Sequence, residues 1–205
     1  MSQPQHPGAD LDAVLDATAS CYLRFGVAKT TAADIAQAVG ISRATLYRRF
    51  GSHEALFLDL LTRESAAMAA DAEVCLARFE DPLERILEGI LFSIEEIRRR
   101  PVHVAVFGGD SVAWAATQAI QVEALRRIGE AGIRPLLDSS MADDSVSEQD
   151  MMDLVDWILR ILISYAVVPG GGGRRPMEIR RQLAAWFLPA FETRTGGRNS
   201  GSMRH

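Results

Sequence analysis

The 205-residue sequence contains only two cysteines, Cys21 and Cys75. Two cysteines are too few for the disulfide framework of a small secreted domain, so we expect both to be buried thiols in a reducing cytoplasm. The N-terminus lacks the basic segment and apolar stretch that together mark a secretion signal. The densest apolar stretch, from Trp157 to Val168, is interrupted by Arg160 and is too short to span a membrane. We therefore expect a cytoplasmic protein with no membrane partner.

Strand signals are almost absent as well. Apolar residues recur at spacings of three and four, as in amphipathic helices, and period-two alternation is essentially missing. Apolar residues make up 48% of the chain, which is enough for a substantial core. We predict an all-α fold of about nine helices without internal repeats. The predicted helices cover about 10–25, 32–39, 43–49, 53–79, 82–100, 102–107, 111–129, 148–167 and 176–193.

The segments outside these helices are polar or rich in glycine and proline. We predict disordered tails at 1–8 and 194–205. An acidic surface loop is predicted at 138–147, and a glycine-rich connection follows Pro169.

Charge is distributed unevenly along the chain. Taken alone, the net charge of −5 at pH 7 argues against a nucleic-acid partner. Between Arg24 and His53, however, five basic residues and the single acid Asp34 give a local charge of +4, which leaves −9 for the remainder. A compact basic segment joined to an acidic body suggests one surface that binds a polyanion and another with a different task.

Residues 30–57 read TTAADIAQAVGISRATLYRRFGSHEALF and predict two short helices joined by a tight turn. Ala36 is small enough for a close crossing of the helices, and Gly40 permits the positive φ that the turn requires. The residues expected to form a small core beneath the pair are Ile35, Val39, Ile41 and Leu46. The open side of the second helix then carries Arg43, Ala44, Thr45, Tyr47 and Arg48. Such a helix fits the major groove of DNA, with its N-terminal residues facing the base edges.

This stretch closely resembles the helix-turn-helix of the tetracycline-repressor (TetR) family of bacterial transcriptional regulators. The resemblance covers about residues 10–60 and is carried by Thr31, Asp34-Ile35-Ala36, Gly40-Ile41-Ser42, Leu46-Tyr47, Phe50 and Glu54-Ala55-Leu56. It implies a helix-turn-helix DNA-binding domain at 9–52 and an effector-binding and dimerisation domain at 53–193. It also implies a homodimeric repressor that binds double-stranded operator DNA and is released by a small-molecule effector.

One position departs from the family pattern. His53 stands where the family usually has a lysine that touches a phosphate. A neutral imidazole still donates one hydrogen bond, and the alternative is a tolerated substitution on an exposed turn. We expect Tyr47 to be exposed, because Leu46 and Phe50 already face inward. The predicted DNA-binding residues are Thr31, Ser42, Arg43, Thr45, Tyr47, Arg48 and His53.

The resemblance further implies a cavity for a largely apolar effector, although each candidate side chain also suits a plain core. The candidates are Met68, Phe92, His103, Phe107, Trp114 and Tyr165. The last two long helices carry more apolar residues than one buried stripe requires, so we predict a four-helix bundle with a second copy. The alternative is that both helices cover the core of a monomer. The predicted dimer-interface residues are Leu154, Trp157, Ile158, Ile161, Leu183, Trp186, Phe187 and Ala190.

Signals for catalysis are weak. The sequence has no HExxH or Cys-x-x-Cys motif, and Gly170–Gly173 lacks the order of a phosphate-binding loop. We therefore expect no enzyme activity, no metal and no cofactor. Two other classes stay open: a DNA-binding regulator controlled by a protein partner, and an all-α enzyme in which the helix-turn-helix is incidental.

Overall fold

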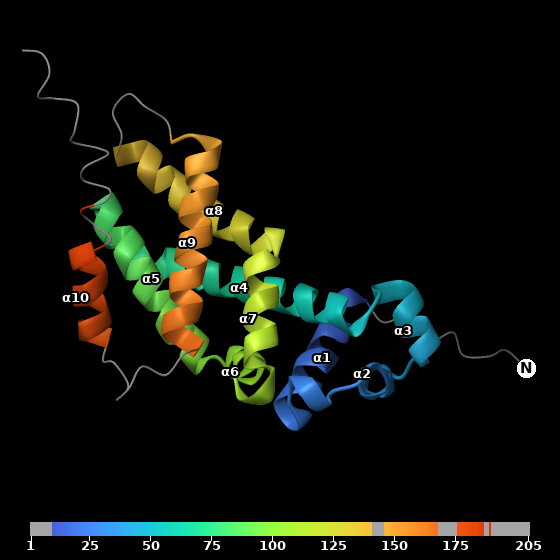
Figure 1. Ribbon diagram of the computed structural model, residues 1–205. Helices are drawn as coiled ribbons and strands as arrows, with labels where there is room; N and C mark the ends of the chain where they lie inside the picture. The colour runs from blue at the N-terminus through green and yellow to red at the C-terminus, as the bar shows by residue number, and fades with distance from the viewer. Residues whose placement is uncertain (1–9, 141–145, 168–175, 187–188, 190–205) are drawn as a thin grey trace, which may run out of the picture. The chain divides into compact units, whose positions relative to one another are not determined.

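The computed structural model describes residues 10–140, 146–167, 176–186 and 189 (Figure 1). The described residues form ten α-helices, two short 3-10 helices and no strand, which confirms the all-α prediction. The predicted tails at 1–8 and 194–205 and the glycine-rich connection after Pro169 lie outside the described residues. The helices are α1 (Leu11–Phe25), η1 (Val27–Lys29), α2 (Ala32–Val39), α3 (Arg43–Phe50), α4 (His53–Leu76), α5 (Pro82–Arg99), α6 (Pro101–Phe107), η2 (Gly109–Ser111), α7 (Val112–Gln121), α8 (Glu123–Ser140), α9 (Glu148–Val167) and α10 (Pro176–Trp186).

The single helix predicted for 111–129 is wrong, because two helices occupy this region. Val122 has an extended backbone with φ −75° and ψ 110°, and it separates α7 from α8. A β-branched residue readily adopts this extended conformation. The sequence has no glycine or proline at this position that would have predicted the end of a helix. The expected loop at 138–147 is also wrong at its start, since α8 continues through Pro135 to Ser140. Leu137, 2% exposed, is buried in the core on the far side of the proline, and this packing outweighs the local preference.

The chain divides into two compact units. Unit 1 contains Met1–Glu64 and Arg100–Val122, and unit 2 contains Ser65–Arg99 and Glu123–His205. The first turns of α4, together with α6 and α7, therefore belong to the unit that carries α1, α2 and α3. The predicted boundary between a DNA-binding domain at 9–52 and an effector-binding and dimerisation domain at 53–193 is a division by function, and it stays a prediction.

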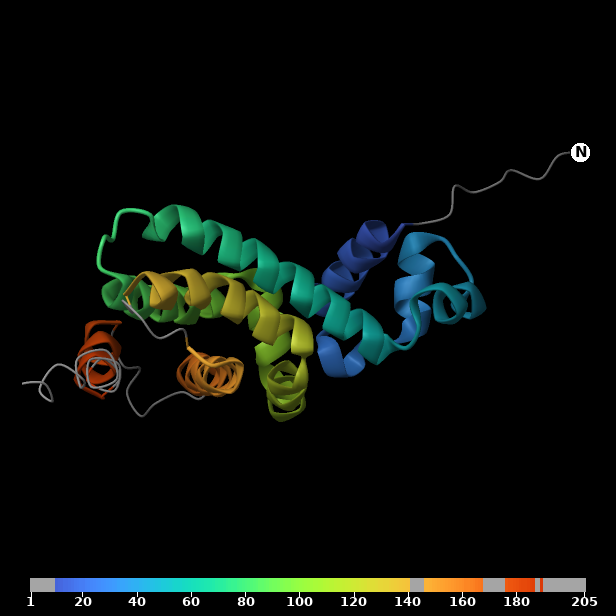
Figure 2. The same ribbon diagram turned by 90° about the horizontal axis from the view of Figure 1, so that it is seen from above.

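Unit 1 is held together by helices packed around α1. This helix contacts both α2 and α6, while α2 contacts α3 and α6 contacts α7. In Figure 2, α1, α2 and α3 gather beside the N-terminal half of α4. Side chains with no more than 2% exposure in this unit include Val14, Tyr22, Ile35, Leu46, Leu56, Phe57 and Leu60.

Unit 2 is built on α5, which contacts α8, α9 and α10. Figure 2 shows α9 and α10 on the same side of α5. Ile158 and Leu183, both predicted for a dimer interface, belong to the core of this unit with only 5% of their surface exposed. Leu154 and Ile161 pack partly against that core.

Two of the predicted interface residues remain on the surface of unit 2. Trp157 is 43% exposed and Trp186 is 82% exposed. The other two predicted interface residues, Phe187 and Ala190, lie outside the described residues. The prediction of a dimer through α9 and α10 therefore depends on the two tryptophans.

The two thiols differ in their surroundings. Cys21 is buried, and burial raises the pKa of its thiol. Cys75 is exposed near the end of α4, so the expectation that both cysteines are buried is wrong for it. The preceding residue, Val74, is 78% exposed as well. No described helix is both long and apolar enough to cross a membrane.

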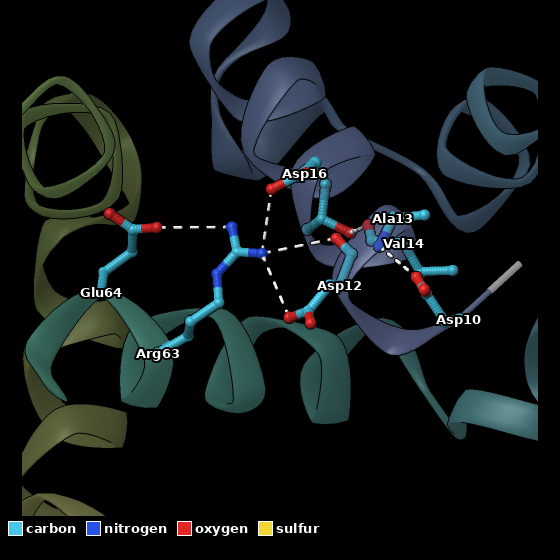
Figure 3. Close-up of polar contacts among 8 residues, drawn as sticks. Asp10, Asp12, Ala13, Val14, Asp16, Arg63 and Glu64 are labelled. Atoms are coloured by element: carbon cyan, nitrogen blue, oxygen red, sulfur yellow. Dashed lines mark hydrogen bonds and ion pairs between the residues drawn. The ribbon is translucent and has the colours of Figure 1, made fainter. Parts of the chain in front are cut away.

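Arg63 ties α4 to the first turns of α1 (Figure 3). One terminal nitrogen, Nη1, lies 2.9 Å from Asp16 Oδ1 and 3.8 Å from Asp12 Oδ1. The same nitrogen donates a 3.4 Å hydrogen bond to the backbone oxygen of Asp12, while Nη2 lies 3.4 Å from Glu64 Oε1. One guanidinium group therefore pairs with three carboxylates and donates a hydrogen bond to the backbone of α1. Because Asp12 and Asp16 are largely exposed, each pair is worth little in water.

We expect Arg63→Met to lower the free energy of unfolding by about 1 kcal/mol at low salt, since several weak pairs are lost together. Urea unfolding followed by circular dichroism measures this change. The difference should shrink when salt rises from about 0.05 M to about 0.5 M, because exposed pairs are screened. Arg63→Lys is the matched control, and it should retain part of the stabilisation. A loss that does not depend on salt would show that packing of the side chain, and not charge, is responsible.

Candidate DNA-binding site

The turn between α2 and α3 has the geometry that the sequence predicts. Gly40 has φ +75°, in the left-handed region that favours glycine. The N–H of Ile41 donates to the oxygen of Ala36 at 3.0 Å, and the N–H of Gly40 donates to Gln37 at 3.1 Å. Ala36 is only 2% exposed, so the two helices meet closely at its small side chain. These bonds fix the direction in which α3 leaves the turn.

The two ends of α3 are held by its own sequence. Ser42 Oγ accepts a 3.1 Å hydrogen bond from the N–H of Thr45 and so caps the start of the helix. Gly51 ends the helix, and its N–H donates to the oxygen of Tyr47 at 3.1 Å. Leu46 is completely buried, which turns the opposite side of the helix outward.

The outward side of α3 is basic. Arg43, Tyr47, Arg48 and Arg49 are exposed there, and Tyr47 shows 41% of its surface, as predicted. Thr45 differs from the expectation for the open side, because it is half-buried and its hydroxyl lies 2.9 Å from Ser42 Oγ. The exposed set thus combines guanidinium groups with one phenol on eight residues of helix.

Arg43 and Tyr47 form a pair on this face. The Arg43 Nη2 donates to the Tyr47 hydroxyl at 3.4 Å, and the Arg43 Cζ lies 5.3 Å from the centre of the Tyr47 ring. The spacing of four residues places both side chains on one helix face. The pair holds a cation at the first residue of α3 and a hydroxyl group one turn later. The N-terminal residues of the recognition helix face the base edges in helix-turn-helix complexes.

Thr31 is engaged at the start of α2. Its hydroxyl donates to Asp34 Oδ2 at 2.6 Å, and the N–H of Thr31 donates to the same oxygen at 2.8 Å. These bonds hold the pKa of the Asp34 carboxyl below its ordinary range. The only acid of the basic segment is therefore tied to the N-terminus of α2. The five basic residues Arg24, Lys29, Arg43, Arg48 and Arg49 are all exposed.

His53 lies where neither sequence interpretation placed it. It is half-buried at the first residue of α4, and its Nε2 lies 3.1 Å from the hydroxyl of Tyr22 on α1. The two rings meet edge to face with 5.7 Å between their centres. An exposed turn is therefore the wrong description of this position. Contact of His53 with a phosphate remains a prediction, and it would compete with the bond to Tyr22.

Tyr22 is the residue of this region whose role the sequence did not reveal. It is almost completely buried, with 1% of its surface exposed. Only the phenol oxygen signals a need for a polar partner inside the protein. Burial raises the pKa of this hydroxyl far above its ordinary range, so it stays protonated.

The six effector candidates are divided between the two units. In unit 1, the rings of His103 and Phe107 stack with 6.4 Å between centres, and Trp114 lies against Phe57 at 4.5 Å. In unit 2, Met68 is buried, Phe92 is half-buried, and the Tyr165 hydroxyl donates to Gln182 Oε1 at 2.9 Å. Their role in binding an effector stays a prediction. Among the described residues, no group of three or more His, Cys, Asp or Glu side chains could hold a metal ion.

We expect acidification to destabilise the protein through His53. Burial lowers the pKa of His53, so the unfolded chain binds a proton that the folded chain does not. The free energy of unfolding should therefore decrease as the pH falls below about 6.5, the ordinary histidine value. Urea unfolding at about pH 7.5 and about pH 5.5 should show a smaller loss for His53→Gln, which does not titrate, than for the unmodified chain. Equal losses in both proteins would exclude His53 as the source.

Known proteins share both the motif and the fold. Residues 14–60 match the family described as bacterial regulatory proteins, tetR family. The uncharacterized HTH-type transcriptional regulator Rv1255c of Mycobacterium tuberculosis is 29% identical over 178 residues, covering 87% of this chain and 83% of that protein. The HTH-type transcriptional repressor Rv1474c of the same organism is 33% identical over 67 residues, covering 33% of this chain and 36% of that protein.

Solved structures of TetR family repressors have a similar fold. The TetR family repressor AlkX from Dietzia superposes with a TM-score of 0.64 and 20% identity, covering 92% of this chain and 98% of that one. Thermus thermophilus FadR, a TetR family repressor solved in complex with lauroyl-CoA, gives a TM-score of 0.62 at 22% identity, covering 87% and 93% of the two chains. Residues 14–60 therefore carry the helix-turn-helix of bacterial regulatory proteins of the TetR family, and most of the chain is similar to an HTH-type transcriptional regulator.

Proposed function

We propose that the protein is a homodimeric repressor whose operator complex is dissolved by a largely apolar small molecule. The single observation that carries the DNA-binding half of this proposal is the exposed basic face of α3 above the buried Leu46. Arg43 at the first residue of α3 and Tyr47 one turn later can reach base edges and phosphates. Ser42 caps α3, and its hydroxyl and the nearby helix amides suit phosphate oxygens. Thr31 caps α2, and its hydroxyl would exchange its acceptor Asp34 for a phosphate oxygen on binding DNA. Binding to the chromosome would place the protein in the cytoplasm, as predicted from the sequence.

The dimer is proposed from the exposed tryptophans of unit 2. Trp157 and Trp186 are large aromatic side chains on α9 and α10, and aromatic residues dominate the energy of many interfaces. A second copy would cover them and place a second recognition helix on the DNA. Two half-sites bound by a two-fold dimer are about 34–36 Å apart, which is one turn of DNA.

The effector is proposed from the apolar character of the six candidates and from the relatives. An effector that binds a conformation with a different spacing of the two recognition helices would draw the protein off its operator. A protein partner in place of a small molecule is the second possibility. Release of labelled operator by lauroyl-CoA, the ligand in the Thermus thermophilus FadR structure, supports the first arrangement. Release that requires a protein and responds to no small molecule supports the second.

Two substitutions on α3 should act differently. Arg43→Ala removes a side chain that can read guanine, so it should reduce discrimination between operator and random DNA by about 1–3 kcal/mol. Tyr47→Phe keeps the ring and removes a hydroxyl group aimed at phosphates, so it should weaken binding to all sequences alike. Fluorescence anisotropy with an operator selected from a random pool measures both effects.

The two variants also have a shared control. Wild-type affinity should fall steeply between about 50 and 200 mM salt, because each neutralised phosphate adds about 0.9 to the slope of log K against log salt. Glu54→Gln, an exposed change in the first turn of α4 that removes no basic group, should leave sequence preference intact. If Arg43→Ala and Tyr47→Phe both bind like wild type, the exposed face of α3 is not the DNA-binding face.

The dimer should depend on Trp186. We expect Trp186→Ser to increase the dimer dissociation constant by at least about tenfold, since truncation of an aromatic anchor costs about 2 kcal/mol or more. Sedimentation velocity measures this change, and circular dichroism should show unaltered helix content. Met177→Ser is the matched control, because Met177 is equally exposed on α10. A wild-type protein that stays monomeric at micromolar concentration would contradict the dimer and the paired half-sites.

A further inference from the structure

Four rings follow one another through unit 1. His53 meets Tyr22 edge to face at 5.7 Å, Tyr22 lies 6.4 Å from Phe57, and Phe57 lies 4.5 Å from Trp114. They come from three helices: α4 supplies His53 and Phe57, α1 supplies Tyr22, and α7 supplies Trp114. The series begins at the first residue after the helix-turn-helix and ends on a helix far away in sequence.

We propose that His53 and Trp114 are positioning residues for α3, linked to one another through Tyr22 and Phe57. The inference rests on the proposed DNA-binding function, and it adds a route by which α7 influences operator affinity. Neither residue needs to touch DNA for this role.

The middle of the series is tightly packed. Tyr22 is 1% exposed and Phe57 is fully buried, so neither ring has room to move alone. The Tyr22 hydroxyl meets the imidazole of His53 at 3.1 Å, and loss of that contact would leave a polar group buried. A displacement of one ring must therefore be accommodated by its neighbours.

The inner end of the series is joined to α3 by a very short connection. Only Gly51 and Ser52 separate the end of α3 at Phe50 from His53. Ser52 caps α4, accepting the N–H of Ala55 at 3.1 Å. A Cβ atom at Gly51 would lie 3.3 Å from the Cβ of Ala55, and Gly51 has φ +78°, so the connection has little freedom. A change in the position of His53 therefore passes to the DNA-binding helix.

The outer end of the series can be reached from outside. Trp114 is 38% exposed, although its ring lies against the buried Phe57. A molecule or helix that moves the indole changes its contact with Phe57. This arrangement gives unit 1 a surface side chain with a contiguous path to the start of α4.

A mutant cycle on operator affinity tests the link. His53→Ala and Trp114→Leu should each weaken binding by at least about threefold, and their effects should not multiply, with a coupling factor of about three or more. In a Tyr22→Phe background the coupling should fall to within about twofold of one, because the polar contact with His53 is gone. His53→Gln should restore much of the affinity, since its amide can meet the Tyr22 hydroxyl.

The matched control is Phe107→Leu, which removes another ring of unit 1 that stacks on His103 and not on Phe57. It should show no coupling with His53. Circular dichroism monitors folding, and Trp114→Phe replaces Trp114→Leu in the cycle if the latter fails to fold. Multiplicative effects of His53 and Trp114 overturn the inference. Failure of the unmodified protein to bind any DNA overturns the proposed function itself, so the two failures are distinguishable.

Fluorescence supplies a readout that a merely structural role would not change. With the proposed interface residues Trp157 and Trp186 left in place, the difference in emission between the unmodified protein and Trp114→Phe isolates the signal of Trp114. Because coupling is reciprocal, operator binding should shift its emission, and Tyr22→Phe should abolish the shift. Emission that responds to operator equally with and without the Tyr22 hydroxyl contradicts the proposed link.

Discussion

The burial of Leu46 determines which side of α3 meets solvent. Its side chain is completely buried, as is that of Ile35 on α2, and the crossing at Ala36 brings the two helices close enough for both to share one core. A rotation of α3 about its axis would expose Leu46 and bury charged arginines, which is costly. The basic face is thus fixed by an apolar contact on the opposite side of the helix. The caps at Thr31 and Ser42 then set where each helix begins.

Apolar contacts orient α3, and the charges on its surface then determine what the helix attracts. The basic residues of the segment 24–53 are exposed. Its one acid, Asp34, is engaged in the capping box with Thr31. The remainder of the chain is acidic, so attraction to DNA is confined to one region and non-specific contact elsewhere is opposed. The Arg63 group adds a second function for charge, because it joins α1 to α4 inside the same unit.

The sequence predicts best where local chemistry decides the structure. Gly40, Ser42 and Leu46 each have a requirement that a short stretch of sequence reveals, and the helices around them form at the expected residues. The passage of α8 through Pro135 is not predictable locally, because the packing of Leu137 in the core decides it. The break at Val122 has no glycine or proline to mark it. The contact between His53 and Tyr22 joins residues 31 positions apart, so no local pattern could reveal it. Helical spacing also does not tell a core position from an interface position, and Ile158 and Leu183 are part of the core of unit 2.

The central claim is that α3 enters the major groove of two half-sites with its basic face toward the bases. Protection of guanine N7 from methylation tests it directly, because this atom lies in the major groove. On an operator selected from a random pool, the account predicts two protected clusters about 10 base pairs apart, or a whole number of DNA turns apart, that disappear together in Arg43→Ala. Protection limited to the minor groove, or guanines that stay reactive in the bound complex, would contradict the account.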